Sequence, residues 1–234
     1  MPGRHRKSSK IALRVGTCAV AGIAFAGPMG AAYADTISSG ASSAADVTTL
    51  PRTISHSTGH VVRAQQAPPP KRVTAKDVIA LAEKQVGTSA DGSGNTKFTR
   101  WYMTTPRARQ TVARDGGSVG GYAGAEWCDM FVSWVGNRLG ISSTFGEDPY
   151  TVTHAQWFQA QKRWGTTPKP GAVVFFSWSG GKSADAIDHV GLVVKDNGDG
   201  TIQTVEGNTN GGEVAAKTRD TSTVVGYGYP AYAK

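Results

Sequence analysis

The chain has 234 residues, with 25 Lys and Arg against 17 Asp and Glu, 30 Gly, 11 Pro and two Cys. This length allows one or two domains, and 39% hydrophobic residues exclude a chain that is disordered throughout. Two cysteines exclude a disulfide-dense scaffold and a cysteine-rich zinc fold. The formal charge of +8 would indicate a nucleic-acid or membrane partner only if the basic residues belonged to the folded part.

Residues 1–34 have the three parts of a secretory signal peptide. The first 14 residues hold five Lys and Arg and no acid, Val15–Ala26 is apolar, and Ala32–Ala34 has the Ala-x-Ala cleavage pattern. The alternative, an uncleaved anchor, is disfavoured because a membrane span needs about 20 apolar residues. We therefore expect cleavage after Ala34, a secreted, extracellular protein that can associate with the cell wall, and no stable membrane insertion.

Cleavage changes the charge of the mature chain. It removes five basic residues and no acid, which leaves 20 basic and 17 acidic residues, a net charge of +3. The remaining sequence has no basic stripe interleaved with aromatic residues. We therefore expect no nucleic-acid partner.

Residues 35–72 differ in composition from the rest. They are rich in Ser, Thr and Ala, lack aromatic residues and end in three prolines before Lys71 and Arg72. This composition predicts a disordered linker with a stiff polyproline end, and leaves open whether it is a spacer through a cell envelope. Residues 73–234 have the size of one domain.

The first part of this domain is predicted to be helical. Thr74 and Asp77 have the spacing of a capping box, and Gly87 ends the first helix. Its apolar face consists of Val78, Leu81, Ala82 and Val86. A polar loop at 88–96, a short helical turn at Phe98–Tyr102 and a glycine-rich loop at 115–124 follow, before helices over 127–139 and Val152–Trp164.

The second part is predicted to form strands. Segments rich in Val, Phe and Tyr cover Ala172–Trp178, His189–Lys195, Thr201–Glu206 and Thr223–Tyr229, with a hairpin turn at 196–200. Helices followed by strands predict an α+β domain with an antiparallel sheet.

Cys128 is the only cysteine that remains after signal cleavage. It lies in the first turn of the 127–139 helix, on the stripe that continues through Phe131, Val135 and Leu139. The helix dipole lowers the pKa of a thiol at this end, which makes a nucleophilic thiolate. The alternative is a buried, inert thiol, and the position alone leaves both open.

Two histidines lie in the predicted domain, His154 and His189. The hairpin partner of the His189 strand carries Glu206 and Asn208, which strand alternation places on one face. The hairpin can bring that end beside His189, so that a polar group fixes its tautomer. His154 has no such partner in the sequence, and we expect a surface or packing residue there.

The motifs around these residues resemble a known family. The block Ala125–Trp134 resembles the cysteine block of CHAP domains, the cysteine, histidine-dependent amidohydrolase/peptidase modules of peptidoglycan hydrolases. Asp188–Gly191 resembles their histidine motif, and Val205–Asn208 resembles their Glu-x-Asn motif. The segments Asn95–Phe98, Trp101–Tyr102 and Pro170–Phe176 are also similar to the family. The related NlpC-type endopeptidases usually have a second histidine as third polar residue, so Glu206 with Asn208 favours CHAP.

The resemblance implies a papain-like α+β fold, with the cysteine helix packed on an antiparallel sheet, and hydrolysis of amide bonds in peptidoglycan. It matches Cys128 to the nucleophile, His189 to the general base, and Glu206 and Asn208 to the groups that orient the imidazole. We expect a monomer without a cofactor. The alternatives are a non-catalytic secreted wall-binding module on this fold and a cysteine amidohydrolase that acts on another amide.

Substrate binding and metal binding are less constrained. Five aromatic residues near the motifs are candidates for substrate binding, with core packing as the alternative: Trp101, Tyr102, Tyr122, Trp127 and Trp178. Asp91–Asn95 resembles the start of a calcium loop, but Thr96 replaces its glycine and Tyr102 its final glutamate. We therefore interpret it as a turn and expect no metal; no Cys/His cluster suits zinc.

Overall fold

The computed structural model describes residues 72–233. The predicted signal peptide, its cleavage site and the predicted linker up to Lys71 lie outside the described residues. The α-helices in the described range are α1 (Ala75–Glu83), α2 (Lys97–Thr104), α3 (Pro106–Asp115), α4 (Cys128–Arg138), α5 (Ser142–Phe145) and α6 (Thr151–Ala160). The strands are β1 (Trp164–Gly165), β2 (Val173–Phe176), β3 (His189–Asp196), β4 (Thr201–Thr209), β5 (Glu213–Asp220) and β6 (Val224–Gly228).

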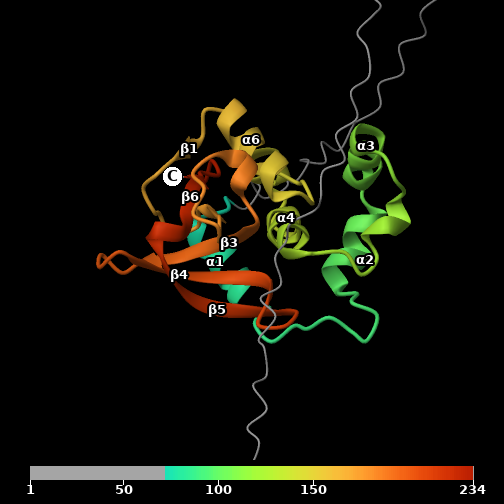
Figure 1. Ribbon diagram of the computed structural model, residues 1–234, viewed down its shortest axis with the longest axis horizontal. Coiled ribbons are helices and arrows are strands. Elements are labelled where there is room, and N and C mark those ends of the chain that lie inside the picture. Colours follow the sequence, from blue (N-terminus) through green and yellow to red (C-terminus); the bar gives the residue numbers. More distant parts are fainter. Residues whose placement is uncertain (1–71, 234) are drawn as a thin grey trace, which may run out of the picture. The chain divides into compact units, whose positions relative to one another are not determined.

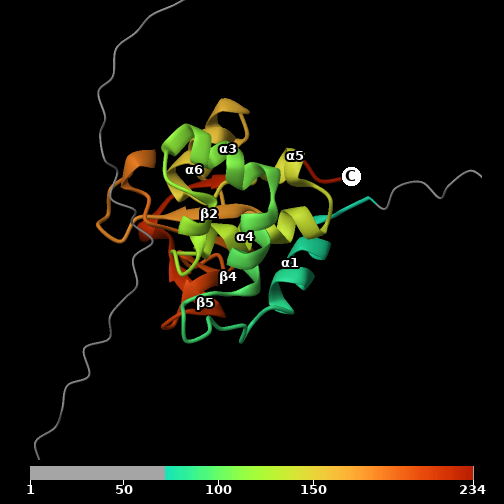
Figure 2. The same ribbon diagram turned by 90° about the vertical axis from the view of Figure 1, so that its right-hand side faces the viewer.

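The strands form one antiparallel sheet in the order β1-β6-β2-β3-β4-β5. Helix α4 packs on β3 and β4, and α2 packs on α4. Figure 1 shows α4 between the sheet and the pair α2 and α3, and Figure 2 shows the same arrangement after a quarter turn. The predicted α+β class, with helices first and an antiparallel sheet after them, is confirmed.

The two faces of the sheet carry separate apolar clusters. On the helical face, side chains such as Val190, Leu192 and Val205 pack with α4 in the larger cluster. The opposite face buries a smaller cluster that includes Val174, Phe176, Val193, Ile202 and Tyr227. Because successive side chains of a strand point to opposite faces of the sheet, the same strands contribute residues to both clusters.

Several predicted boundaries need correction. The Thr74–Asp77 capping box is present, but α1 ends at Glu83, and Val86, expected on its apolar face, is 47% exposed. The helix expected to reach Trp164 ends at Ala160, because Lys162 has a positive φ of 54° and Trp164 pairs with Gly228 in the sheet. Helix α3, which Thr105 caps and Pro106 begins, and strand β5 were not predicted.

No helix within residues 72–233 combines the length and the apolar character that a membrane span requires.

Candidate active site

Cys128 is the first residue of α4 and is almost fully buried, with 2% of its surface exposed. Within residues 72–233 it is the only cysteine, and it forms no disulfide bond. Trp127 occupies the N-cap position and its side chain does not cap the helix. The positive end of the helix dipole therefore acts on the sulfur, which favours a thiolate.

The end of β4 lies directly against this first turn. A Cβ atom added to Gly207 would come within 2.7 Å of Phe131 Cβ and 2.9 Å of Trp127 Cζ3. Only a glycine therefore allows β4 to approach α4 so closely. The Asn208 side chain donates to the carboxylate of Glu126, two residues before Cys128. These contacts hold the 206–208 end of β4 beside the start of the cysteine helix.

His189 begins β3 and is buried, with Phe176 opposite it in the β2–β3 register. Its Nε2–H donates to Glu206 Oε2 at 2.9 Å. This hydrogen bond fixes a proton on Nε2 of His189. Nδ1 is therefore the ring nitrogen that can exchange a proton with a nucleophile or a substrate. The predicted partnership of His189 and Glu206 across the hairpin is thus present.

Glu206 is fully buried and accepts four hydrogen bonds. Thr204 Oγ1 and Arg219 Nε donate to Oε1, at 2.6 and 2.9 Å, while Arg219 Nη2 and His189 Nε2 donate to Oε2, at 2.6 and 2.9 Å. Burial alone raises the pKa of the carboxyl, but the hydrogen bonds and charges of Arg219 and His189 outweigh it and lower the pKa to about 2. Glu206 is therefore a carboxylate at any ordinary pH.

Trp178 forms an aromatic wall beside the imidazole. Its ring centroid lies 5.5 Å from that of His189, and it stacks on Phe176 at 5.3 Å. The backbone N–H of Trp178 donates to the carboxylate of Asp188 at 3.1 Å. This hydrogen bond connects Trp178 to the residue directly before His189. Among the five aromatic candidates, Trp178 is the one next to the imidazole.

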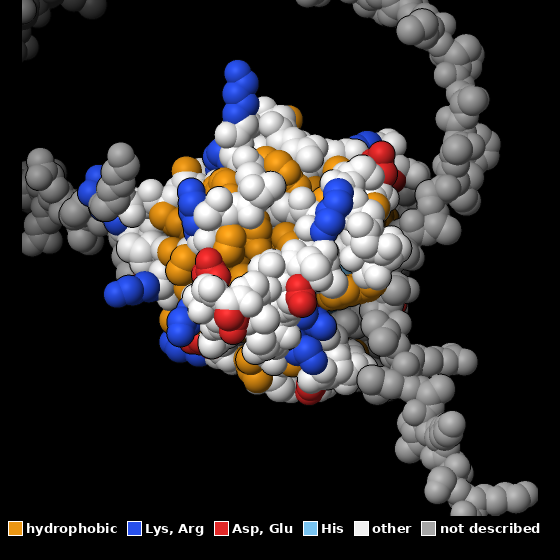
Figure 3. Space-filling view, turned by 60° about the vertical axis from the view of Figure 1, so that its left-hand side comes forward, with side chains coloured by type: hydrophobic (Ala, Val, Ile, Leu, Met, Phe, Trp, Pro, Cys, Tyr) orange, Lys and Arg blue, Asp and Glu red, His pale blue; other side chains and the backbone are white. Residues whose placement is uncertain are grey.

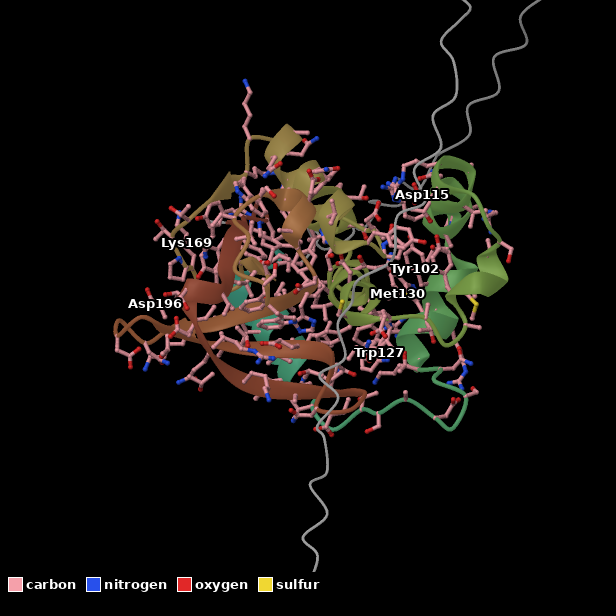
Figure 4. All side chains as sticks on the ribbon, in the orientation of Figure 1. Tyr102, Asp115, Trp127, Met130, Lys169 and Asp196 are labelled. Carbon is pink, nitrogen blue, oxygen red and sulfur yellow. The ribbon has the colours of Figure 1, made fainter. Side chains whose placement is uncertain are left out.

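The other aromatic candidates lie in or against the core. Tyr102 on α2 and Trp127 at the start of α4, both labelled in Figure 4, are buried. The ring of Trp127 stacks on Phe98. The buried Tyr122 contacts Thr111 Oγ1 at 2.7 Å through its hydroxyl. Trp101 is half-buried at the edge of the same cluster. These positions give Tyr102, Tyr122 and Trp127 a packing role.

Asn208 departs from the simple alternation that placed it on the face of Glu206. The β4–β5 register shifts between Glu206 and Thr209, and Asn208 has a positive φ of 54°. This bulge turns the chain, and the Asn208 side chain donates to Glu126. Asn208 therefore helps to hold the segment before Cys128, while Glu206 bonds to the imidazole.

The turn at residues 91–95 supports the same segment from the other side. Asp91 Oδ1 accepts hydrogen bonds from Ser93 and Asn95, and Arg100 donates to Oδ2, so the carboxylate is already engaged. Asn95 Oδ1 in turn accepts the backbone N–H of Gly124 at 3.1 Å. The turn therefore braces the glycine-rich loop that leads to Cys128.

His154 differs from the expectation of a residue without a partner. It is fully buried, its Nδ1 lies 2.7 Å from Asp129 Oδ1, and its Nε2 donates to the carbonyl of Phe145 at 2.9 Å. Burial raises the pKa of Asp129. Burial lowers the pKa of His154, but Asp129 outweighs this and raises it overall. The expected packing role of His154 is present. The expected surface position is wrong, because His154 is buried and contacts the carboxyl group of Asp129, 25 residues earlier in the sequence.

Arg219 is the residue of this site that sequence reasoning missed. It lies on β5, a strand that was not predicted, and its guanidinium lies 4.8 Å from the Trp178 ring centre as well as on Glu206. The segment Glu213–Asp220 has three adjacent apolar residues followed by four polar ones, so it carries no alternating signal that could have predicted β5 or Arg219.

Residues 118–208 match the family model described as CHAP domain. The match includes Cys128, His189, Glu206 and Asn208, and it begins after α3. No curated protein and no solved structure matches the chain. The match confirms the resemblance and the papain-like fold, and it indicates a hydrolase of the amidase or peptidase kind.

Proposed function

We propose that this chain, whose residues 118–208 match the CHAP-domain model, is a secreted cysteine hydrolase that cleaves amide bonds in peptidoglycan. The observation that carries the proposal is the buried hydrogen bond between His189 and the ionised Glu206, at the strand end that packs on the first turn of the Cys128 helix. A nucleophile, a base and a group that orients the base are the parts that acyl transfer through a thiol requires.

The reaction follows from the protons that these groups hold. The Cys128 thiolate, paired with the imidazolium of His189, attacks the amide carbonyl, and the Cys128 backbone N–H stabilises the oxyanion. His189 Nδ1 then gives its proton to the leaving amine, and an acyl-enzyme remains. His189 then deprotonates a water molecule, which attacks the acyl-enzyme, releases the acid and restores the thiolate–imidazolium pair. Glu206 holds Nε2 throughout and stabilises the positive ring.

The proposal includes the location of the protein. Residues 1–34 have the composition of a secretory signal, and the mild positive charge left after cleavage suits an anionic wall. Sequencing of the secreted protein from its N-terminus tests this part, and we expect the mature chain to begin at Asp35. A secreted product that still contains Val15–Ala26 would contradict it.

Digestion of purified peptidoglycan tests the activity, with Cys128→Ala as the control. We expect new free amino groups and mass-assigned fragments that identify the cleaved bond, and none from the control. Equal release by a folded Cys128→Ala protein would overturn the role of the cysteine.

If no peptidoglycan is digested, the reactivity of the Cys128 thiol decides between two interpretations. No release from several wall chemistries, with a thiol that iodoacetamide alkylates rapidly near neutral pH, would mean that the enzyme acts on another amide. No release together with an unreactive thiol would favour a non-catalytic wall-binding module.

A further inference from the structure

We propose that Arg219 is a positioning residue of the hydrolytic site, which holds Glu206 aimed at His189 and fixes the Trp178 wall beside the imidazole. The inference deepens the proposed function and rests on it, since it concerns the same thiol and imidazole. No motif of the sequence includes Arg219, and its placement depends on the pairing of β5 with β4.

Arg219 fixes the geometry of the Glu206 carboxylate. Arg219 uses two N–H groups as a fork, with Nε on Oε1 and Nη2 on Oε2. A bidentate pair fixes the plane of the carboxylate as well as its position. Thr204 and His189 occupy the other acceptor sites of the two oxygens. Glu206 therefore cannot rotate without breaking a bond to Arg219.

The same guanidinium also covers the ring of Trp178. It lies 4.8 Å from the ring centre of Trp178, while the Trp178 ring lies beside His189. A cation over an indole is attracted by the ring electrons. The side chain of Arg219 is 23% exposed, so that it closes the site at the surface. Arg219 thus restrains the imidazole of His189 in two ways, through its hydrogen-bond acceptor Glu206 and through the neighbouring ring of Trp178.

Arg219 also keeps Glu206 ionised, which decides which nitrogen of His189 carries the ring proton. The charged groups that act on Glu206 are His189 and Arg219, and the carboxylates of Asp129 and Asp188 also act on His189. Without Arg219, burial dominates and Glu206 takes up a proton at a higher pH. A protonated Glu206 would donate to Nε2 and leave the ring proton on Nδ1. In that tautomer Nδ1 cannot accept the proton of Cys128.

The test compares Arg219→Met with Lys217→Met in the purified mature chain, residues 35–234, in which Cys128 is the only cysteine. Lys217 lies on the same face of β5, opposite Thr204, but its ammonium bonds to Asn210 rather than to Glu206, so its variant removes a charge without removing a hydrogen bond to the carboxylate. Two profiles are measured against pH, the kcat/KM of peptidoglycan digestion and the rate at which iodoacetamide alkylates Cys128.

In Arg219→Met we expect the acidic limb of both profiles to move up by about 1–3 pH units, the usual effect of a neighbouring opposite charge. We also expect kcat to fall with little change in KM, and Lys217→Met to match the wild type. A folded Arg219→Met protein whose profiles keep the wild-type limb would overturn the proposal, even if its rate were lower, because a purely structural loss is independent of pH.

Arg219→Lys keeps the test decisive if the methionine variant does not fold. Lysine retains the charge but replaces the planar fork by a single point of contact. We expect the acidic limb at its wild-type position and a reduced kcat. A wild-type kcat in this variant would overturn the positioning role.

The alkylation profile separates this inference from the proposed function. If wild-type protein does not digest peptidoglycan but the alkylation limb shifts in Arg219→Met, the substrate is wrong and the role of Arg219 stands. If wild-type protein digests peptidoglycan and neither limb shifts, the role of Arg219 is wrong and the proposed function stands.

Discussion

Glu206 is a fully buried carboxylate that three side chains hold in the charged form. Burial of a charge is costly unless partners compensate for it, and here Arg219, His189 and Thr204 do so. Because the pKa of Glu206 is lowered to about 2 in the folded protein, its proton affinity differs between the folded and unfolded chains. Glu206 therefore links the stability of the fold to pH.

The linkage gives a prediction for acid unfolding. The stabilisation by ionised Glu206 is fully present above the unfolded pKa, for which the ordinary value is 4.5, and is lost as pH falls towards about 2. The loss should be on the order of 3 kcal/mol. Urea unfolding between pH 6 and pH 2 measures it, with Glu206→Gln as the control. A wild type that loses no more stability than the control would contradict the ionised state of Glu206.

Sequence reasoning found the residues whose chemistry is local and missed those that depend on pairing. Cys128 was predicted from its place in a helix, and the contact between His189 and Glu206 from a hairpin whose turn is visible in the sequence. Arg219 and the Asp129–His154 contact depend on strand register and helix packing over 13 and 25 residues. Local periodicity does not encode those distances.

At the scale of elements, a second acid–imidazole pair joins the cysteine helix to its neighbours. The Phe145 carbonyl can only accept, so His154 Nε2 carries a proton, and one further proton lies between His154 Nδ1 and Asp129 Oδ1. The pair is therefore electrically neutral in either arrangement. It connects α4 to α6 and to the end of α5.

Loss of one partner should be costly. We expect His154→Ala to lower the free energy of unfolding by about 3–5 kcal/mol, because it leaves a buried carboxyl unpaired. Asp129→Asn should cost clearly less, since its amide N–H can donate to Nδ1 of the neutral ring. Chemical unfolding of both variants measures the difference. Equal losses in the two variants would show that the pair is not what joins these helices.

The approach of β4 to α4 depends on a missing side chain. We expect Gly207→Ala to destabilise the fold by about 1–3 kcal/mol and to lower kcat, because its methyl group would push the first turn of α4 away from β4. Gly92→Ala is the matched control, since a Cβ there meets nothing within 4 Å. Thermal unfolding and digestion rates provide the measurements. A Gly207→Ala protein with wild-type values for both would refute the close contact.

The elements were predicted better in their type than in their limits. The capping box and the Val, Phe and Tyr strands gave most of the helices and strands, since those signals are local. Two ends were wrong because tertiary contacts decide them, as for Trp164, which pairs with β6 instead of continuing α6. Strand β5 was not predicted, because its sequence is mostly polar and it becomes extended only through its pairing with β4.

At the scale of the molecule, the described residues form one closed unit. The backbone N–H of Ala233 donates to the carbonyl of Val73, so both ends of the domain meet, and Tyr232 bonds to Gly171. On the face that Figure 3 turns forward, Lys and Arg side chains stand apart, with Asp and Glu among them. That face therefore offers no continuous basic stripe of the kind that nucleic-acid binding requires.

The closed unit predicts that the preceding segment is dispensable for folding. A chain that begins at Val73 should keep the free energy of unfolding of the longer chain to within about 0.5 kcal/mol, because the core lies within residues 73–232. Urea unfolding of the two chains compares them directly. A truncated chain that fails to fold would place the domain boundary upstream of Val73.

A titration of digestion against Cys128 alkylation tests the catalytic role of the cysteine most directly. The protein is treated with increasing iodoacetamide, the alkylated fraction is measured by intact mass, and peptidoglycan hydrolysis is measured in the same samples. We expect hydrolysis to fall in proportion to the alkylated fraction of Cys128 and to reach zero at full modification. Hydrolysis that survives full alkylation, or that is absent from the untreated protein, would contradict it.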